Sequence, residues 1–210
     1  MELYGNKTAP GAVLYVHGRA GSASEAERYA PLFPGRAVAG LDYRTFSPWE
    51  TGREIRAAAE KLRERHDSLI LVAVSIGAYF SMHAGLEGLA DRAYFISPVV
   101  DMEKLIEGLM AASGVTEAEL DARGVIPTSF GEDLSWEYLT YVRAHPLKWD
   151  VPTEMLCGTA DELTSIDTMR AFAEAHGAGL TVMAGGEHWF HTPEQLRFLD
   201  DWIRRKEAIK

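Results

Sequence analysis

The chain has 210 residues, enough to bury one sizeable core without a metal ion or a disulfide bond. It carries 21 Lys and Arg against 31 Asp and Glu, and the formal net charge of −10 argues against nucleic acid or an anionic membrane surface as a partner. The single cysteine, Cys157, excludes an intrachain disulfide. We see neither a basic segment followed by an apolar run at the start nor an apolar stretch of membrane-spanning length. These features predict a cytoplasmic protein and leave its oligomeric state open.

Short, nearly continuous apolar runs recur along the chain and alternate with amphipathic stretches. Such runs are typical of strands that are covered on both faces of a sheet. The predicted strands are Ala12–Val16, Ala37–Leu41, Ser68–Val74, Ala93–Ser97, Thr153–Cys157 and Leu180–Ala184. The predicted helices between and after them are Ser22–Ala30, Pro48–His66, Ile76–Leu89, Ser165–His176 and Pro193–Lys206. This alternation predicts an α/β fold with a parallel sheet and right-handed crossovers.

One segment, residues 98–150, departs from this alternation. Between Ser97 and Pro152 no strand is predicted, and the pattern instead favours helices over Asp101–Ala112, Thr116–Ala122 and Ser135–Ala144. Ligand sites in α/β sheets lie at the carboxyl ends of the strands, so a late helical insertion favours a cap over such a site. The alternative is a segment that merely covers apolar sheet surface.

The strongest chemical signal is Ser75, which follows a buried strand directly and precedes a helix. A sharp strand-to-helix turn exposes a serine hydroxyl at the sheet edge and places backbone N–H groups beside it. The turn needs small residues two positions before and after the serine, and here these are Ala73 and Gly77. The same residue also suits a simpler role as the N-cap of the following helix.

A second turn, His17-Gly18, follows the first predicted strand. The turn allows a backbone N–H to point toward the nucleophile, where it would form an oxyanion hole with the N–H of Ile76. Arg19 is the first candidate for that N–H donor and Ala20 the second. The Arg19 side chain is also a candidate ligand for a substrate carboxylate, or is simply solvated. We expect His17 to hold the loop by hydrogen bonds.

An acid follows the strand Thr153–Cys157. The run Gly158-Thr159-Ala160-Asp161 presents Asp161 at the carboxyl edge, where a carboxylate can hold a histidine base in one tautomer. Glu162, Asp167 and Asp101 are the competing acids, and Asp161 also suits a simpler role as a helix-capping residue before Ser165. Cys157 itself is interpreted as a buried residue of the strand.

A histidine follows the last predicted strand, in Gly185-Gly186-Glu187-His188. A base on a loop beyond a strand end can reach across to the serine, which favours His188, with His191 as the rival. The order serine, acid, histidine along the chain supports this assignment, because each residue follows a successively later strand.

Together these residues resemble the α/β-hydrolase superfamily, in particular its small serine esterase, lysophospholipase-like and serine aminopeptidase-like members. The resemblance covers nearly the whole chain and implies a single domain, residues 1–210, with a mostly parallel sheet of about six strands, helices on both faces and a small helical cap. It also implies that Ser75 is acylated, that His188 shuttles the proton and that water releases the acid. Two departures are Ala73 in place of the usual glycine and first strands that are either missing or reduced to Leu3–Tyr4.

We therefore expect hydrolysis of a carboxylic ester or thioester with a small or medium acyl group. Arg19, Trp136 and Trp189 are the candidate substrate-binding residues: Arg19 for a substrate carboxylate, and the two tryptophans for an apolar or aromatic acyl pocket. The alternatives are a peptidase or amidase with the same triad and a non-catalytic binding protein of the same fold. The seven histidines show no metal-ligand spacing, and no phosphate-binding loop is present, so no metal and no cofactor are expected.

Overall fold

The computed structural model describes residues 1–129 and 133–208. Its contacts divide the chain into two compact units. The first combines Met1–Val100 with Trp149–Lys210, and the second is Asp101–Lys148.

The first unit is built on a seven-stranded sheet in the order β1-β3-β2-β4-β5-β8-β9. All neighbours pair in parallel except β1, which is antiparallel to β3. The strands are β1 Glu2–Gly5, β2 Gly11–Val16, β3 Arg36–Leu41, β4 Ser68–Val74, β5 Arg92–Ile96, β8 Thr153–Gly158 and β9 Gly179–Met183. The six predicted strands are confirmed, and the reduced Leu3–Tyr4 segment adds β1 as a seventh.

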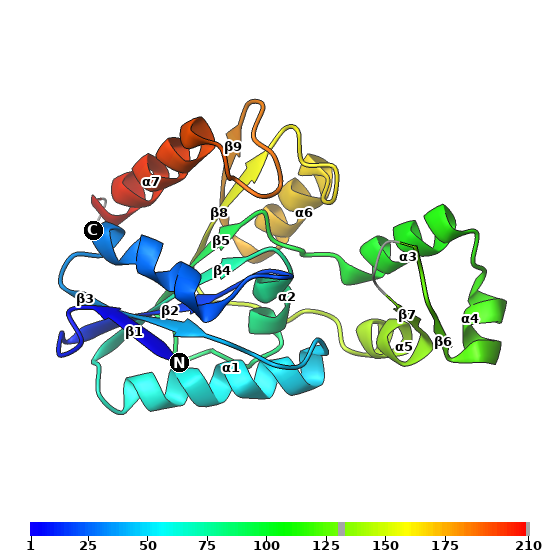
Figure 1. The fold of residues 1–210 in the computed structure, drawn as a ribbon, viewed down its shortest axis with the longest axis horizontal. Helices are drawn as coiled ribbons and strands as arrows, with labels where there is room; N and C mark the ends of the chain where they lie inside the picture. Colours follow the sequence, from blue (N-terminus) through cyan, green and yellow to red (C-terminus); the bar gives the residue numbers. More distant parts are fainter. Residues whose placement is uncertain (130–132, 209–210) are drawn as a thin grey trace. The chain divides into compact units, whose positions relative to one another are not determined.

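Helices cover both faces of this sheet (Figure 1). They are η1 Ala23–Leu32, α1 Pro48–Arg63, α2 Ile76–Met82, α6 Ile166–His176 and α7 Pro193–Ala208. On one face, η1 and α7 enclose a core cluster with alternate side chains of the strands, among them Tyr29, Val72 and Trp202. Because successive strand residues point to opposite faces, the other half of each apolar run packs under α1, α2 and α6.

Two predicted helices differ from those observed. The predicted helix Ile76–Leu89 ends at Met82, since the chain turns through Gly85 at a φ of +62° and leaves the helical path. The predicted helix Ser22–Ala30 is a 3₁₀ helix, η1, and contains Pro31, whose missing N–H removes a helical hydrogen bond.

The second unit contains α3 Met102–Ser113, α4 Glu117–Arg123, β6 Val125–Ile126, β7 Leu134–Ser135 and α5 Trp136–Ala144. The three predicted helices are confirmed. The prediction that no strand lies between Ser97 and Pro152 was wrong, because β6 and β7 pair there as a two-residue antiparallel ladder. Hydrophobic periodicity cannot reveal strands of only two residues. Arg143 of α5 pairs with three carboxylates of α3 and α4, those of Glu103, Glu107 and Glu117, and ties the unit together.

Parallel strands place their following loops along one edge of the sheet. The loops after β2, β4, β8 and β9 carry the four sequence-predicted motifs, so the fold gathers them at that edge. No helix in the described ranges is both long and apolar enough to cross a bilayer.

Candidate active site

Ser75 lies at a sharp turn between β4 and α2. Its φ of 52° and ψ of −124° are strained for a residue with a side chain. Bonds on both sides hold it there. The Ser75 N–H donates to the Ile96 carbonyl at 3.0 Å, and the Ser75 carbonyl accepts from Ala78 and Val99, each at 3.1 Å. The turn is therefore built into the junction of β4, β5 and α2.

Close packing explains the small residues that flank this turn. A Cβ atom at Gly77 would lie 2.3 Å from the His17 carbonyl oxygen, so only glycine lets α2 approach the end of β2. A Cβ atom at Gly18 would lie 3.1 Å from the Ser75 Cβ. Ala73, the departure from the usual pattern, is fully buried within β4, where its methyl group is accommodated.

The side chains of Ser75, His188 and Asp161 form one hydrogen-bonded chain. His188 Nε2 lies 2.8 Å from Ser75 Oγ, and His188 Nδ1 lies 2.8 Å from Asp161 Oδ2. A carboxylate only accepts, so the Nδ1–H of His188 donates to Asp161 and Nε2 is left to accept from the serine hydroxyl. Residues 113 positions apart thus meet at one edge of the sheet.

Asp161 is held as a carboxylate. Its side chain is 1% exposed, and burial alone raises the pKa of a carboxyl group. Hydrogen bonds from His188, Thr164 and Leu163 outweigh that burial, so the pKa of Asp161 lies below its ordinary value. The Leu163 and Thr164 N–H groups donate to Oδ1 at 2.9 and 3.0 Å, and the Thr164 hydroxyl donates to Oδ2 at 2.9 Å.

The competing acids and the competing histidine lie elsewhere. Asp167 is exposed and pairs with Arg170, Asp101 accepts from the Lys104 N–H as the N-cap of α3, and Glu162 is exposed. His191 is 63% exposed and faces Glu187 at 3.3 Å. Within the described ranges, none of these four side chains is hydrogen-bonded to Ser75 or to His188.

The loop after β2 forms a tight turn beside Ser75. The Gly21 N–H donates to the Gly18 carbonyl at 3.2 Å, and Ala20 takes a φ of 59°. The Tyr43 hydroxyl donates to the His17 carbonyl at 3.0 Å, and its ring stacks on the His17 ring with centroids 4.1 Å apart. This loop is thereby fixed next to the first residue of α2, Ile76, whose N–H has no intrahelical acceptor because it opens the helix.

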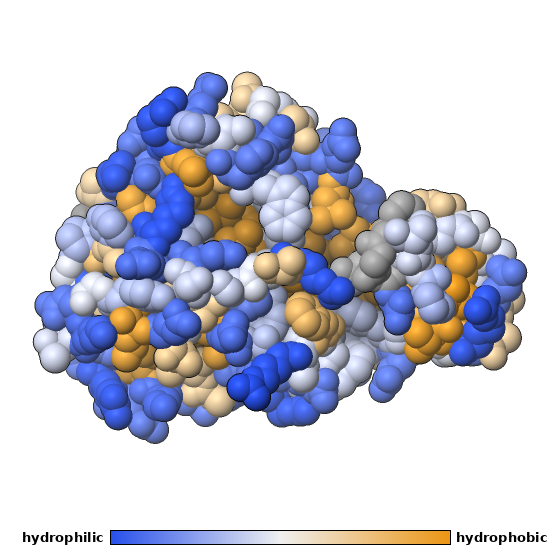
Figure 2. Space-filling model, viewed as in Figure 1, coloured by the Kyte–Doolittle hydropathy of each residue, from blue (hydrophilic) through white to orange (hydrophobic). Residues whose placement is uncertain are grey.

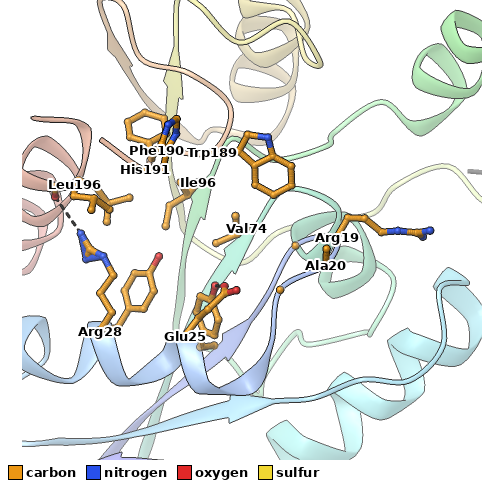
Figure 3. A pocket seen from close by; sticks show the side chains of 15 residues that line it. Arg19, Ala20, Glu25, Arg28, Val74, Ile96, Trp189, Phe190, His191 and Leu196 are labelled. Carbon is orange, nitrogen blue, oxygen red and sulfur yellow. Dashed lines mark hydrogen bonds between the residues drawn. The ribbon is translucent and has the colours of Figure 1, made fainter. Parts of the chain in front are cut away.

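Each of the three predicted substrate-binding residues lies in a different environment. The Arg19 guanidinium lies over the Phe46 ring, 4.5 Å from its centroid, and points away from the nearby pocket (Figure 3). Trp189 is 59% exposed, and its ring meets the His188 ring edge-on at 5.5 Å. Trp136 is the first residue of α5 in the second unit, so its assignment stays a prediction.

A pocket of about 510 Å³ opens beside Ser75, in the size range of small-molecule sites. It lies between η1 and α7, where Figure 2 shows apolar surface in a hollow. Arg19 and Trp189 lie at one end and Arg28 and Leu196 at the other (Figure 3). Gly18, where an added Cβ atom would lie 3.1 Å from the Ser75 Cβ, is also part of the wall.

Sequence reasoning missed several residues of this site. Thr164, which binds Asp161, carries a weak local signal, since hydroxyl residues near an aspartate often form such turns. Tyr43 and Tyr29 carry none, because their positions depend on the packing of β3 and η1 against the sheet. Within the described ranges, no group of three or more His, Cys, Asp or Glu side chains is arranged to hold a metal ion.

No protein-family model matches the sequence, and no curated protein sequence matches it. Solved structures match over nearly the whole chain. Est1E from Butyrivibrio proteoclasticus superposes with a TM-score of 0.76 at 14% identity, over 96% of this chain and 88% of that one. Alpha/beta hydrolase domain-containing protein 10 from mouse superposes with a TM-score of 0.74 at 16% identity, over 99% and 92%.

A third similar structure is the Pyrococcus furiosus esterase PF2001, with a TM-score of 0.62 at 15% identity, over 95% of this chain and 80% of that one. These likenesses, together with the mixed sheet and its helices on both faces, show that the chain has the α/β-hydrolase fold. The fold prediction made from the sequence is confirmed.

Proposed function

We propose that the protein is a serine hydrolase that cleaves a carboxylic ester or thioester through an acyl-enzyme on Ser75. The observation that carries this proposal is the chain of two 2.8 Å hydrogen bonds from the Ser75 hydroxyl through His188 to a buried carboxylate. A serine is a weak nucleophile until a base lies within hydrogen-bonding distance and is itself oriented by a third group.

In the proposed reaction, Ser75 Oγ attacks the carbonyl carbon while His188 Nε2 accepts its proton. The N–H groups of Ile76 and Arg19 stabilise the negative oxygen of the tetrahedral intermediate. His188 then gives the proton to the leaving alcohol or thiol, which departs and leaves an acyl group on Ser75. A water molecule, deprotonated by His188, attacks that ester and releases the acid. Asp161 holds His188 in one tautomer throughout and stabilises its charged form.

The similar structures are consistent with this proposal. PF2001 is named an esterase, and Est1E has been solved with ferulic acid bound. At 14% and 15% identity, both likenesses concern the fold and leave the substrate to be set by the pocket of this chain.

A fluorophosphonate probe tests the assignment, since it reacts only with an activated serine. We expect labelling of the wild type, loss of labelling in Ser75→Ala and retention in Ser22→Ala, a matched surface serine. Turnover of p-nitrophenyl acetate compared with an aminoacyl anilide then separates ester from amide preference. An unlabelled but folded wild type, or a labelled Ser75→Ala variant, contradicts the proposal.

A further inference from the structure

The pocket beside Ser75 is mostly apolar, but η1 contributes two charged side chains to its wall. Arg28 is already paired, because its Nη atoms donate to Asp200 Oδ1 at 2.8 and 2.7 Å and to the Leu196 carbonyl at 3.2 Å. Glu25 is paired as well, since it accepts from the Tyr15 hydroxyl and from the Ser22 N–H. Neither charge therefore calls for a charged ligand.

Tyr29 is the exception in this wall. It is 5% exposed, lines the pocket and stacks on Tyr15 with ring centroids 4.9 Å apart. Within residues 1–129 and 133–208, its hydroxyl makes no hydrogen bond. Burial raises the pKa of Tyr29, so the phenol stays neutral and can donate its proton. Tyr29 lines the pocket, and a hydroxyl in an apolar wall that has no protein partner is open to a water molecule or a ligand group.

The pocket adjoins the proposed reaction centre, although Ser75 and His188 are not themselves part of its wall. Val74 directly precedes Ser75, Trp189 directly follows His188, and a Cβ atom at Gly18 would lie 3.1 Å from the Ser75 Cβ. A group attached to a carbonyl carbon at Ser75 therefore enters between Arg19 and Trp189 and extends toward Arg28 and Leu196 (Figure 3).

We infer that this pocket binds an uncharged, ring-bearing part of the substrate that carries a hydroxyl group, and that Tyr29 selects this group by a hydrogen bond. The inference rests on the proposed function and specifies its substrate class. Aromatic walls favour a ring, since stacked and edge-on contacts add to the free energy of burial. The internal pairing of Glu25 and Arg28 disfavours a carboxylate or phosphate in the same place.

The test compares p-nitrophenyl esters of phenylpropanoic acid and of its para-hydroxy analogue, together with phenylethyl and para-hydroxyphenylethyl acetates. We expect the wild type to prefer the hydroxylated member of one pair by about tenfold in kcat/KM, the worth of one hydrogen bond. Tyr29→Phe keeps the ring and loses the preference. Tyr94→Phe, which removes a phenol hydroxyl bound to Glu207 outside the pocket, keeps it. A para-carboxy analogue is the poorest substrate of its series.

A pair of variants on α7 tests whether the ring-bearing part of the substrate binds in this pocket. Leu196→Trp fills the far end of the pocket, so it slows both ring-bearing esters far more than it slows p-nitrophenyl acetate. Arg197→Trp, at an exposed neighbouring position outside the pocket wall, changes neither.

Calorimetry on Ser75→Ala separates this inference from the proposed function. We expect para-hydroxyphenylpropanamide to bind more tightly than phenylpropanamide, and Tyr29→Phe in the same background to abolish the difference. Turnover of p-nitrophenyl acetate without discrimination in turnover or binding overturns the inference and leaves the proposed function standing. A folded wild type that hydrolyses no ester overturns the proposed function, while the binding comparison still decides whether the pocket selects a hydroxyl.

Discussion

Asp161 both orients His188 and organises its own loop. Its two oxygens accept from the His188 ring, the Leu163 and Thr164 N–H groups and the Thr164 hydroxyl. Each of these bonds favours the charged carboxylate, and together they make the ionised form stable in a nearly buried place. The carboxylate is therefore a structural element of the site as well as a partner of the proposed base.

Asp161→Asn removes the charge and keeps the shape. In the proposed mechanism, kcat for p-nitrophenyl acetate falls by about 10³–10⁴-fold, because the histidine loses its tautomer and the stabilisation of its charged form. Asp167→Asn, at an exposed acid of the same region, leaves kcat unchanged. A loss of less than about tenfold in folded Asp161→Asn contradicts the proposed role.

The same carboxylate makes stability depend on pH. Its pKa is lower in the folded chain than the ordinary 3.8, so it stabilises the fold fully above that value and the contribution is lost as pH falls through the folded pKa. We expect Asp161→Asn to lower the free energy of unfolding at neutral pH by about 1–3 kcal/mol. Urea unfolding at decreasing pH shows the difference between wild type and variant shrinking; a constant difference contradicts this account.

Cys157 is predicted to be chemically inert in the folded protein. Burial, and next the negative charge of Asp161, raise the pKa of its thiol to about 11. Only the thiolate reacts readily, so iodoacetamide at neutral pH leaves the native chain unmodified and alkylates the urea-unfolded chain. Mass spectrometry measures the difference, and rapid labelling of the native protein is the contrary result.

At the scale of elements, the turn from β4 into α2 requires the end of β2 to lie against the first turn of α2. Gly77 allows that close approach, and the Tyr43 hydroxyl of the segment after β3 donates to the same His17 carbonyl. Three strands therefore position one turn, which accounts for the strained φ of Ser75 being maintained.

Gly77→Ala tests this arrangement. The added methyl group would overlap the His17 carbonyl, so we expect a loss of about 1–3 kcal/mol in the free energy of unfolding and a lower kcat. Gly108→Ala is the matched control, because among the described residues nothing outside its own helix backbone and chain neighbours lies within 4 Å of its Cβ position in α3. Alanine also favours a helix by up to about 1 kcal/mol. Equal effects of the two substitutions on stability disprove the steric argument.

At the scale of the whole molecule, the hydrogen-bonded chain and the pocket are made entirely by the first unit. The proposed chemistry therefore does not require side chains from residues 101–148. A cap formed by residues 98–150, which the sequence predicts, would act on substrate selection instead.

Trp136→Ala tests that prediction. If the segment covers the site, KM for p-nitrophenyl decanoate rises by about tenfold, as expected when an apolar contact is lost, while p-nitrophenyl acetate is unaffected. Glu137→Ala, an exposed neighbour on α5, serves as the control. Unchanged kinetics for both esters indicate that Trp136 does not bind substrate.

Some helices and strands, and the three residues of the hydrogen-bonded chain, could be predicted from the sequence, whereas other elements could not. Long apolar runs such as Ser68–Val74 are unambiguous, because a strand covered on both faces needs apolar residues throughout. The sequence did not predict the two-residue strands β6 and β7 or the early end of α2 at Met82. These features depend on the backbone dihedral angles of only a few residues. Ser75, Asp161 and His188 were identified because each follows a strand end, which is a property of local sequence.

The sequence by itself determined the alternation of strands and helices and the order in which serine, acid and histidine follow the strands, because residue periodicity and turn chemistry act over a few neighbouring positions. Only the tertiary structure decided which histidine meets Ser75 and which acid meets that histidine. It alone also decided that Tyr29 lines a pocket near Ser75 with a hydroxyl that makes no hydrogen bond in the described part of the chain. Those contacts join residues far apart in the chain, and their geometry follows from how η1, α7 and the loops pack on the sheet.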